Sequence, residues 1–202
     1  MVFVEYMHII YLHGFRSHPN SKKGQQLRYY CADHSKIQVH LPDLNCSPQE
    51  AILQISQLIE ALGVDNVALV GSSLGGFYAT YFVAKYACPA VLINPAMQPW
   101  RLFQDLFGIE QMPLQITESW TLDAVQLQQL QSIAAIQLLH ADKILVLLQQ
   151  GDEVLDYHQA QYYYREIHPS ALILTDTNGN HAMDDFEEKI PLVLEFLSAA
   201  IE

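Results

Sequence analysis

The sequence predicts an α/β fold in which one doubly wound, mostly parallel sheet of about six strands carries helices on both faces. First, short and almost continuously apolar runs, typical of strands buried on both faces, alternate with longer segments of helical periodicity. Second, the 202 residues fit a single domain, 1–202, with room for one insertion. Third, 50% of the residues are hydrophobic, which excludes a disordered chain.

Six apolar runs are predicted to form the strands, in chain order at 7–12, 37–41, 67–70, 90–93, 144–148 and 171–174. The first belongs to an apolar N-terminus, 1–12, that contains Glu5 but no basic leader and no small-residue cleavage site. We therefore expect a buried first strand there rather than a signal peptide.

Helices are expected between the strands. The clearest, at 48–62, follows Ser47, which forms a capping box with Glu50, has Pro48 at its first position and ends at Gly63. The others are expected at 21–34, 74–87, 157–167 and 191–201.

One interval breaks the alternation, because about fifty residues, 94–143, pass without a convincing strand. It contains both tryptophans, Trp100 and Trp120, and a helix-like tract at 122–139. We predict a helical cap insertion at about 96–141 that lies over one end of the sheet. Its aromatic side chains, Trp100 and Phe103 among them, either bind an acyl chain or pack the insertion onto the sheet.

The charge balance limits the partners. With 10 Lys and Arg against 22 Asp and Glu, the net charge of −12 excludes a general nucleic-acid binder. The charge is uneven, however, since residues 1–36 hold five Lys and Arg and two acidic residues. An anionic small substrate is therefore not excluded.

The cysteines and the longest uncharged stretch also bear on location. Cys31, Cys46 and Cys88 are widely spaced, so we expect reduced thiols, with no disulfide framework and no metal site. The stretch 66–84 has no charge, but the glycine cluster at its centre predicts a strand, a tight turn and a helix rather than a membrane span. We expect a cytoplasmic protein with no cofactor and no membrane partner.

The strongest chemical signal is the GxSxG sequence GSSLGG at 71–76, directly after one predicted strand and before a helix. Serine nucleophiles occupy such strained turns because small neighbours admit a close backbone approach and the helix N-terminus stabilises developing negative charge. This context predicts Ser73 as a nucleophile, with a purely structural turn as the alternative.

A second turn, His13-Gly14, follows the first predicted strand. A turn of this kind supplies one oxyanion-hole amide, so we expect the N–H groups of Phe15 and Leu74 to form the hole. His13 is expected mainly to support this loop by hydrogen bonds, and a role as base, as metal ligand or in contact with the substrate is the alternative.

The acid and the base are expected further along the chain. Asp152 follows a predicted strand and a glycine, although Glu153 and Asp156 are close rivals and the acidic turn could instead cap a helix. His181 lies on a glycine-containing loop after the last predicted strand, where an imidazole can bridge Asp152 and Ser73. We predict it to be the general base.

These blocks together resemble one known family. The sequences YLHGFRSHP at 11–19, GSSLGGFYA at 71–79, NPA at 94–96, GDEVLDY at 151–157 and GNH at 179–181 stand in order. They are similar to the YqiA-like group of small bacterial esterases in the α/β-hydrolase superfamily, over nearly the whole chain.

The resemblance implies a triad of Ser73, Asp152 and His181 and a carboxyl-ester or thioester substrate. Two departures concern the seating of His181. A double glycine usually precedes Asn-His in the family, where this chain has Thr177-Asn178-Gly179, and Ala182-Met183 follows where an aromatic residue is common.

The predicted function is a cofactor-free serine esterase that cleaves esters of short to medium acyl groups through an acyl-enzyme. An acyl-CoA thioesterase with the same triad and a non-catalytic scaffold that binds a ligand are the alternatives. The basic stretch Arg16, Lys22, Lys23 and Arg28 is either a solvated loop or a patch that attracts an anionic substrate. The partner expected is a small acyl ester or thioester.

Overall fold

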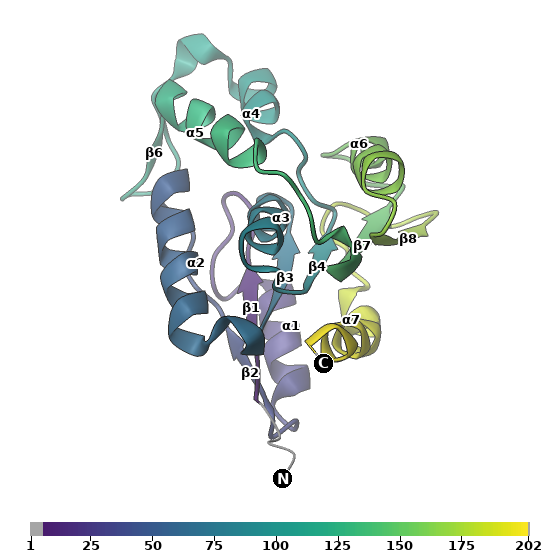
Figure 1. Ribbon diagram of the computed structural model, residues 1–202. Helices are drawn as coiled ribbons and strands as arrows, with labels where there is room; N and C mark the ends of the chain where they lie inside the picture. The colour runs from purple at the N-terminus through teal and green to yellow at the C-terminus, as the bar shows by residue number, and fades with distance from the viewer. Residues whose placement is uncertain (1–5, 202) are drawn as a thin grey trace.

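The computed structural model describes residues 6–201, and its centre is a six-stranded sheet in which every strand pair is parallel (Figure 1). The strand order is β2-β1-β3-β4-β7-β8. The strands are β1 Met7–Leu12, β2 Ile37–His40, β3 Val67–Ser72, β4 Ala90–Ile93, β7 Ile144–Gln149 and β8 Leu172–Asp176. The predicted fold class is confirmed. Residues 1–5 of the predicted N-terminal segment lie outside the described part.

The chain order reverses at β1, which lies between β2 and β3. Leu12 pairs with Gly71 at the carboxyl ends of β1 and β3, and Ser72 pairs with Ile93 of β4. In doubly wound sheets, ligands bind outside the carboxyl ends of the strands at such a reversal. The topology therefore predicts a ligand site at the turns that follow β1 and β3.

Helices cover both faces of the sheet. They are α1 Lys22–Cys31, α2 Pro48–Leu62, α3 Leu74–Tyr86, α4 Pro99–Phe107, α5 Ala124–Ala134, α6 Tyr157–Tyr162 and α7 Phe186–Ile201. Neighbouring strand residues alternate between two cores: Ile9 packs with Leu27 of α1 and Phe186 of α7, while Ile10 packs with side chains of α2 and α3. Figure 1 shows α1 and α7 on one face and α2 and α3 on the other. The predicted capping box of Ser47 and Glu50 is present at the start of α2.

Two predicted boundaries were wrong. Helix α7 begins at Phe186, five residues before Pro191, which lies inside the helix. The first turn is stabilised instead by burial, since Phe186 and Ile190 are fully enclosed and this outweighs the hydrogen bond that Pro191 cannot donate. The segment predicted as one helix over 157–167 is α6 followed by a π-helix, η4, at Tyr163–Ile167.

The chain between β4 and β7 forms α4 and α5 and, between them, a short antiparallel ribbon of β5 Leu114–Gln115 and β6 Thr121–Leu122. The ribbon was not predicted, and α5 is shorter than the helical tract expected at 122–139. Figure 1 shows α4 and α5 beyond the end of α2 nearest the carboxyl ends of the strands. Within residues 6–201 no helix combines the length and the apolar character that crossing a membrane requires.

Candidate active site

Ser73 stands alone between the end of β3 and the first residue of α3, with φ of 55°, a value uncommon outside glycine. Its N–H donates to the carbonyl oxygen of Ile93 at 3.0 Å, and its own carbonyl oxygen accepts the N–H of Phe77 and of Ala96. A Cβ on Gly75 would overlap the carbonyl oxygen of Leu12. The strained turn is therefore held by β4, α3 and β1 together.

His181 joins the predicted residues in one hydrogen-bonded chain. Its Nε2 lies 3.1 Å from Ser73 Oγ, and its Nδ1 lies 2.7 Å from Asp152 Oδ2. The Asp152 side chain is 2% exposed and that of His181 21%. These three residues come from the turn after β3, the turn after β7 and the loop after β8, which meet at the carboxyl edge of the sheet.

The side chains of the three neighbouring acidic residues, Asp152, Glu153 and Asp156, have different hydrogen-bond partners. Asp152 Oδ1 accepts the N–H groups of Val154 and Leu155, both at 2.8 Å, so that Oδ2 remains for His181. Glu153 instead accepts the backbone N–H of His181 at 2.9 Å. Asp156 caps α6 through the N–H of His158. Only Asp152 therefore contacts the imidazole, and the capping role considered for this turn belongs to Asp156.

Two buried amide side chains, missed by the sequence reasoning, hold the loop of His181. Asn94 and Gln149, 3% and 1% exposed, follow β4 and end β7. The Asn94 Nδ2 donates to the carbonyl oxygens of Asn180 and His181 at 3.1 and 3.3 Å. The Gln149 Oε1 accepts the Asn180 N–H at 2.8 Å, while its Nε2 donates to Asp185 at 2.6 Å. Both residues are polar at the ends of apolar strands, and Asn94 also belongs to the NPA block of the family resemblance, although that block assigned it no role.

The two lysines of the basic stretch also contact this loop. Lys23 Nζ donates to the carbonyl oxygen of Ala182 at 2.6 Å, and Lys22 Nζ lies 3.2 Å from Asp184 Oδ1. Burial lowers the pKa of Lys23 to about 8. Lys23 therefore has a partner within the protein, whereas Lys22, with 65% of its side chain exposed, makes only a surface ion pair and can still meet an anion.

The turn after β1 lies directly against the serine. A Cβ built on Gly14 would lie 3.2 Å from Ser73 Cβ and 3.8 Å from its Oγ. Among the hydrogen bonds of residues 6–201, none uses the backbone N–H of Phe15 or of Leu74. Both amides therefore remain available as donors beside Ser73.

His13 supports this turn. It is 2% exposed, its Nδ1 donates to the carbonyl oxygen of Gly14 at 2.9 Å, and its Nε2 accepts the N–H of Leu44 at 2.9 Å. Burial lowers its pKa, which favours the neutral ring that this arrangement needs. Because both ring nitrogens have partners, the geometry favours loop support over substrate contact.

Two of the other substrate-binding candidates, Phe103 and Arg16, lie against the same rings, those of Phe15 and Phe107, whereas Trp100 packs against Phe77. Phe103, 2% exposed, packs against Phe15 with ring centroids 4.4 Å apart. Arg16 is exposed, and its guanidinium lies over the ring of Phe107 at 5.1 Å. Of these three residues, Trp100 is the one that lines the cavity between α3 and α6.

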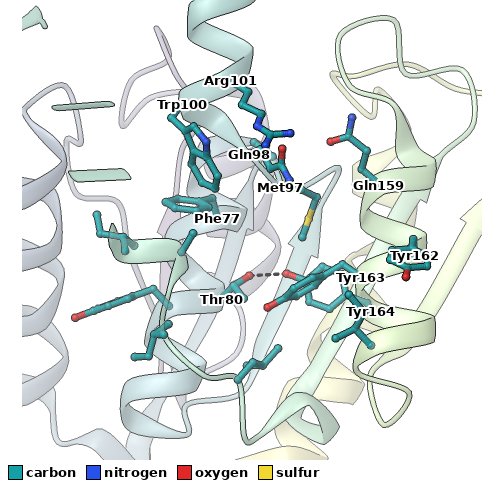
Figure 2. Close-up of a pocket in the computed structure, with 17 residues that line it drawn as sticks. Phe77, Thr80, Met97, Gln98, Trp100, Arg101, Gln159, Tyr162, Tyr163 and Tyr164 are labelled. Carbon is teal, nitrogen blue, oxygen red and sulfur yellow. Dashed lines mark hydrogen bonds between the residues drawn. The ribbon is translucent and has the colours of Figure 1, made fainter. Parts of the chain in front are cut away.

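A cavity of about 530 Å³ lies between α3, α6 and the segment after β4 (Figure 2). Its walls are mostly apolar and aromatic, and Phe77, Met97 and Trp100 are among them. None of Ser73, Asp152 and His181 lines it, although two of its lining residues, Phe77 and Ala96, donate their N–H groups to the Ser73 carbonyl oxygen.

Within residues 6–201 no group of three or more His, Cys, Asp or Glu side chains is placed to hold a metal ion. The three cysteines are free thiols, Cys31 and Cys88 buried and Cys46 partly exposed. Burial raises their pKa values to about 11, so all three are protonated at neutral pH.

Comparison with known proteins identifies relatives over almost the whole chain. The sequence model of an uncharacterised protein family, UPF0227, matches residues 8–198. The UPF0227 protein of Citrobacter koseri is 24% identical over 191 residues, which cover 93% of this chain and 97% of the relative. That of Yersinia pseudotuberculosis is 24% identical over 190 residues, with the same coverage.

Solved structures share the fold. Est1E from Butyrivibrio proteoclasticus, solved with ferulic acid bound, has a TM-score of 0.72 at 17% identity and covers 98% of this chain and 90% of its own. Mouse alpha/beta hydrolase domain-containing protein 10 has a TM-score of 0.69 at 14% identity, covering 96% and 89%. An esterase of Pyrococcus furiosus has a TM-score of 0.66 at 14% identity, covering 98% and 83%. The fold is that of the α/β-hydrolases.

Proposed function

This chain belongs to the UPF0227 family, and from the arrangement of Ser73, His181 and Asp152 we propose that it is a serine hydrolase that cleaves carboxylic esters. Membership of the family agrees with the YqiA-like resemblance of its sequence. The single observation that carries the proposal is the continuous chain from Ser73 Oγ to His181 at 3.1 Å and on to Asp152 at 2.7 Å. A scaffold that only binds a ligand does not need these two hydrogen bonds between Ser73, His181 and Asp152.

The reaction begins with the serine. Ser73 Oγ bonds to the carbonyl carbon of the ester while its proton passes to His181 Nε2. The carbonyl oxygen becomes an oxyanion that accepts the free N–H groups of Phe15 and Leu74. The positive end of the α3 dipole favours the same charge.

His181 then protonates the leaving alcohol, and the ester bond breaks to give the acyl-enzyme. Water, deprotonated by His181, attacks the acyl carbon and releases the acid as the proton returns to Ser73. Asp152 keeps the proton of the imidazole on Nδ1, because the two backbone N–H groups on its Oδ1 fix the carboxylate.

We further propose that residues 1–202 form one hydrolase domain and that 96–141 act as a cap over its site. A small ester is the preferred substrate, and ferulic acid in the neighbour Est1E is one example of an acid that this fold binds. A thioester would require the same residues, but of the two lysines that could meet an anionic thioester such as an acyl-CoA, Lys23 already donates to the Ala182 carbonyl oxygen.

Labelling with a fluorophosphonate probe tests the proposal. The wild type is expected to react at Ser73, and Ser73→Ala is expected to lose both labelling and hydrolysis of nitrophenyl esters. Ser72→Ala, which changes the neighbouring buried serine, is the matched control and should still be labelled. A folded wild type that does not react would overturn the proposal.

A further inference from the structure

The cavity between α3, α6 and the segment after β4 is a separate space from the triad. Its volume of about 530 Å³ falls within the range of small-molecule sites, and none of Ser73, Asp152 and His181 lines it. Residues of α3 and α6 form part of its wall, and residues at the start of α4 form another part. The cavity is therefore large enough to hold a ligand of its own, apart from the group that reacts at Ser73.

The walls of the cavity are aromatic on two sides. Phe77 and Trp100 meet edge to face with centroids 6.4 Å apart, and Tyr163 and Tyr164 do so at 4.9 Å. Figure 2 shows the two pairs on opposite sides of the cavity. Trp100 and Tyr163 are only partly buried, so their rings keep surface that a guest can cover. Because aromatic rings prefer edge-to-face and offset-stacked neighbours, these walls favour an aromatic guest.

Arg101 is the one charged residue among the described residues that line the cavity. It is also the only Lys or Arg in the segment 96–141, which holds four Asp and Glu. Asp105 follows four residues later on α4, a spacing at which helical side chains can pair, yet no ion pair within residues 6–201 includes Arg101. In a chain with a net charge of −12, this guanidinium therefore stands at the cavity without a carboxylate partner.

The two ends of the cavity differ in polarity. Figure 2 shows Gln98 and Arg101 at one end, with Gln159 of α6 across from them, and all three residues are exposed. A guanidinium presents parallel N–H donors that match a carboxylate, and the two carboxamides add further donors. At the other end the hydroxyls of Thr80 and Tyr164 bond to each other at 2.6 Å. The open end is therefore suited to a carboxylate and the interior to an apolar ring.

We propose that this cavity is a binding site for a small aromatic carboxylate, whose ring lies between Trp100 and Tyr163 and whose carboxylate accepts the N–H groups of Arg101. The inference goes beyond the proposed esterase activity and does not depend on it, because no group that reacts with an ester lines the cavity. A neutral analogue of the same shape lacks the charge that Arg101 attracts, so it should bind more weakly.

Calorimetric titration with phenylbutanoate and with its neutral amide tests the site. The wild type is expected to bind the carboxylate about tenfold more tightly than the amide, as one charge-assisted hydrogen bond at an exposed arginine implies. Arg101→Gln is expected to remove this difference while the affinity for the amide stays the same, and Arg101→Lys to retain part of it. Arg28→Gln, at an exposed arginine of α1 outside the cavity, is the matched control and should bind as the wild type.

A cavity-filling variant separates this site from the triad, where a carboxylate can also bind as the product of the proposed reaction. Ala134 lines the cavity, whereas its neighbour Ala135 is exposed and does not. Ala134→Phe is expected to prevent binding of both ligands, and Ala135→Phe to bind them as the wild type does. Binding should also persist after Ser73 has reacted with a small fluorophosphonate.

Two results would overturn this inference. One is equal affinity of the wild type for the carboxylate and the amide, or no binding of either. The other is binding that survives Ala134→Phe and is lost when Ser73 is modified, because the ligand then lies at the triad. A Ser73 that does not react with the probe would instead contradict the proposed function alone, since the titrations of the Arg101 and Ala134 variants require no reaction.

Discussion

The side-chain oxygen of Gln149 accepts the backbone N–H of Asn180 at 2.8 Å, so that a buried residue at the end of β7 fixes the residue preceding His181. The same side chain donates to Asp185 at 2.6 Å, four residues beyond His181. Gln149 thereby holds both sides of the loop, while Asn94 holds the carbonyl oxygens between them. The position of the imidazole depends on these two amides as much as on Asp152.

Replacing Gln149 with Ala is therefore expected to lower kcat by about tenfold to a hundredfold, because a small displacement of a catalytic group has effects of this size. KM should change little, since Gln149 is buried and its side-chain hydrogen bonds go to the loop of His181. Steady-state kinetics on a nitrophenyl ester measure the two constants. The exposed neighbour provides the control, and Gln150→Ala should behave as the wild type. An unchanged kcat in a folded Gln149→Ala protein would contradict the assignment.

Substitutions at Asp152, Glu153 and Asp156 are expected to lower kcat for ester hydrolysis by different amounts. Asp152→Asn is expected to lower kcat by about a thousandfold or more, because the amide cannot stabilise the imidazolium. Glu153→Gln keeps an oxygen that can accept the His181 N–H, so a much smaller loss is expected. Asp156→Asn preserves a good helix cap and should have little effect. A large loss confined to Asp156→Asn would refute the choice of Asp152.

The buried His13 predicts a loss of stability in acid. Its pKa is lowered by burial, although Asp43 opposes the shift, so the unfolded chain takes up the proton first as the pH falls below 6.5. The stabilisation that the neutral His13 contributes to the free energy of unfolding is present above pH 6.5, and it is lost as the pH falls toward the pKa that His13 has in the folded protein. His13→Gln retains an acceptor for the Leu44 N–H but does not titrate. Between pH 7 and 5, urea unfolding should show a smaller loss for this variant, and equal losses would contradict the prediction.

Lys23 predicts a stability change in base with the same sense as that of His13, because a lowered pKa again makes stability rise with pH. Burial lowers its pKa from 10.5 to about 8, so between these values the unfolded chain binds more protons and stability rises with pH. Lys23→Met removes this contribution while other titrating groups remain. The difference in unfolding free energy between wild type and Lys23→Met should therefore shift in favour of the wild type from pH 8 to 10. No relative change across this window would show that the ammonium is well solvated.

Much of the fold was predictable because its signals are local. The apolar runs of β1, β3, β4 and β7 lie on buried strands, and the capping box at Ser47 fixed the start of α2. The start of α7 was not predictable, because Pro191 is a strong local signal for a first turn, whereas the burial of Phe186 and Ile190 depends on the sheet that they cover.

The sequence by itself determined the class of the fold and the position of the strained serine turn, because hydrophobic period and small residues act over a few neighbours. Only the tertiary structure decided that Asp152, and neither Glu153 nor Asp156, contacts the imidazole of His181, that Lys22 and Lys23 contact the loop of His181, and that an aromatic cavity lies between α3 and α6. These features join residues from separate parallel strands and helices. Their side chains meet only when the crossovers bring the carboxyl ends of those strands to one edge.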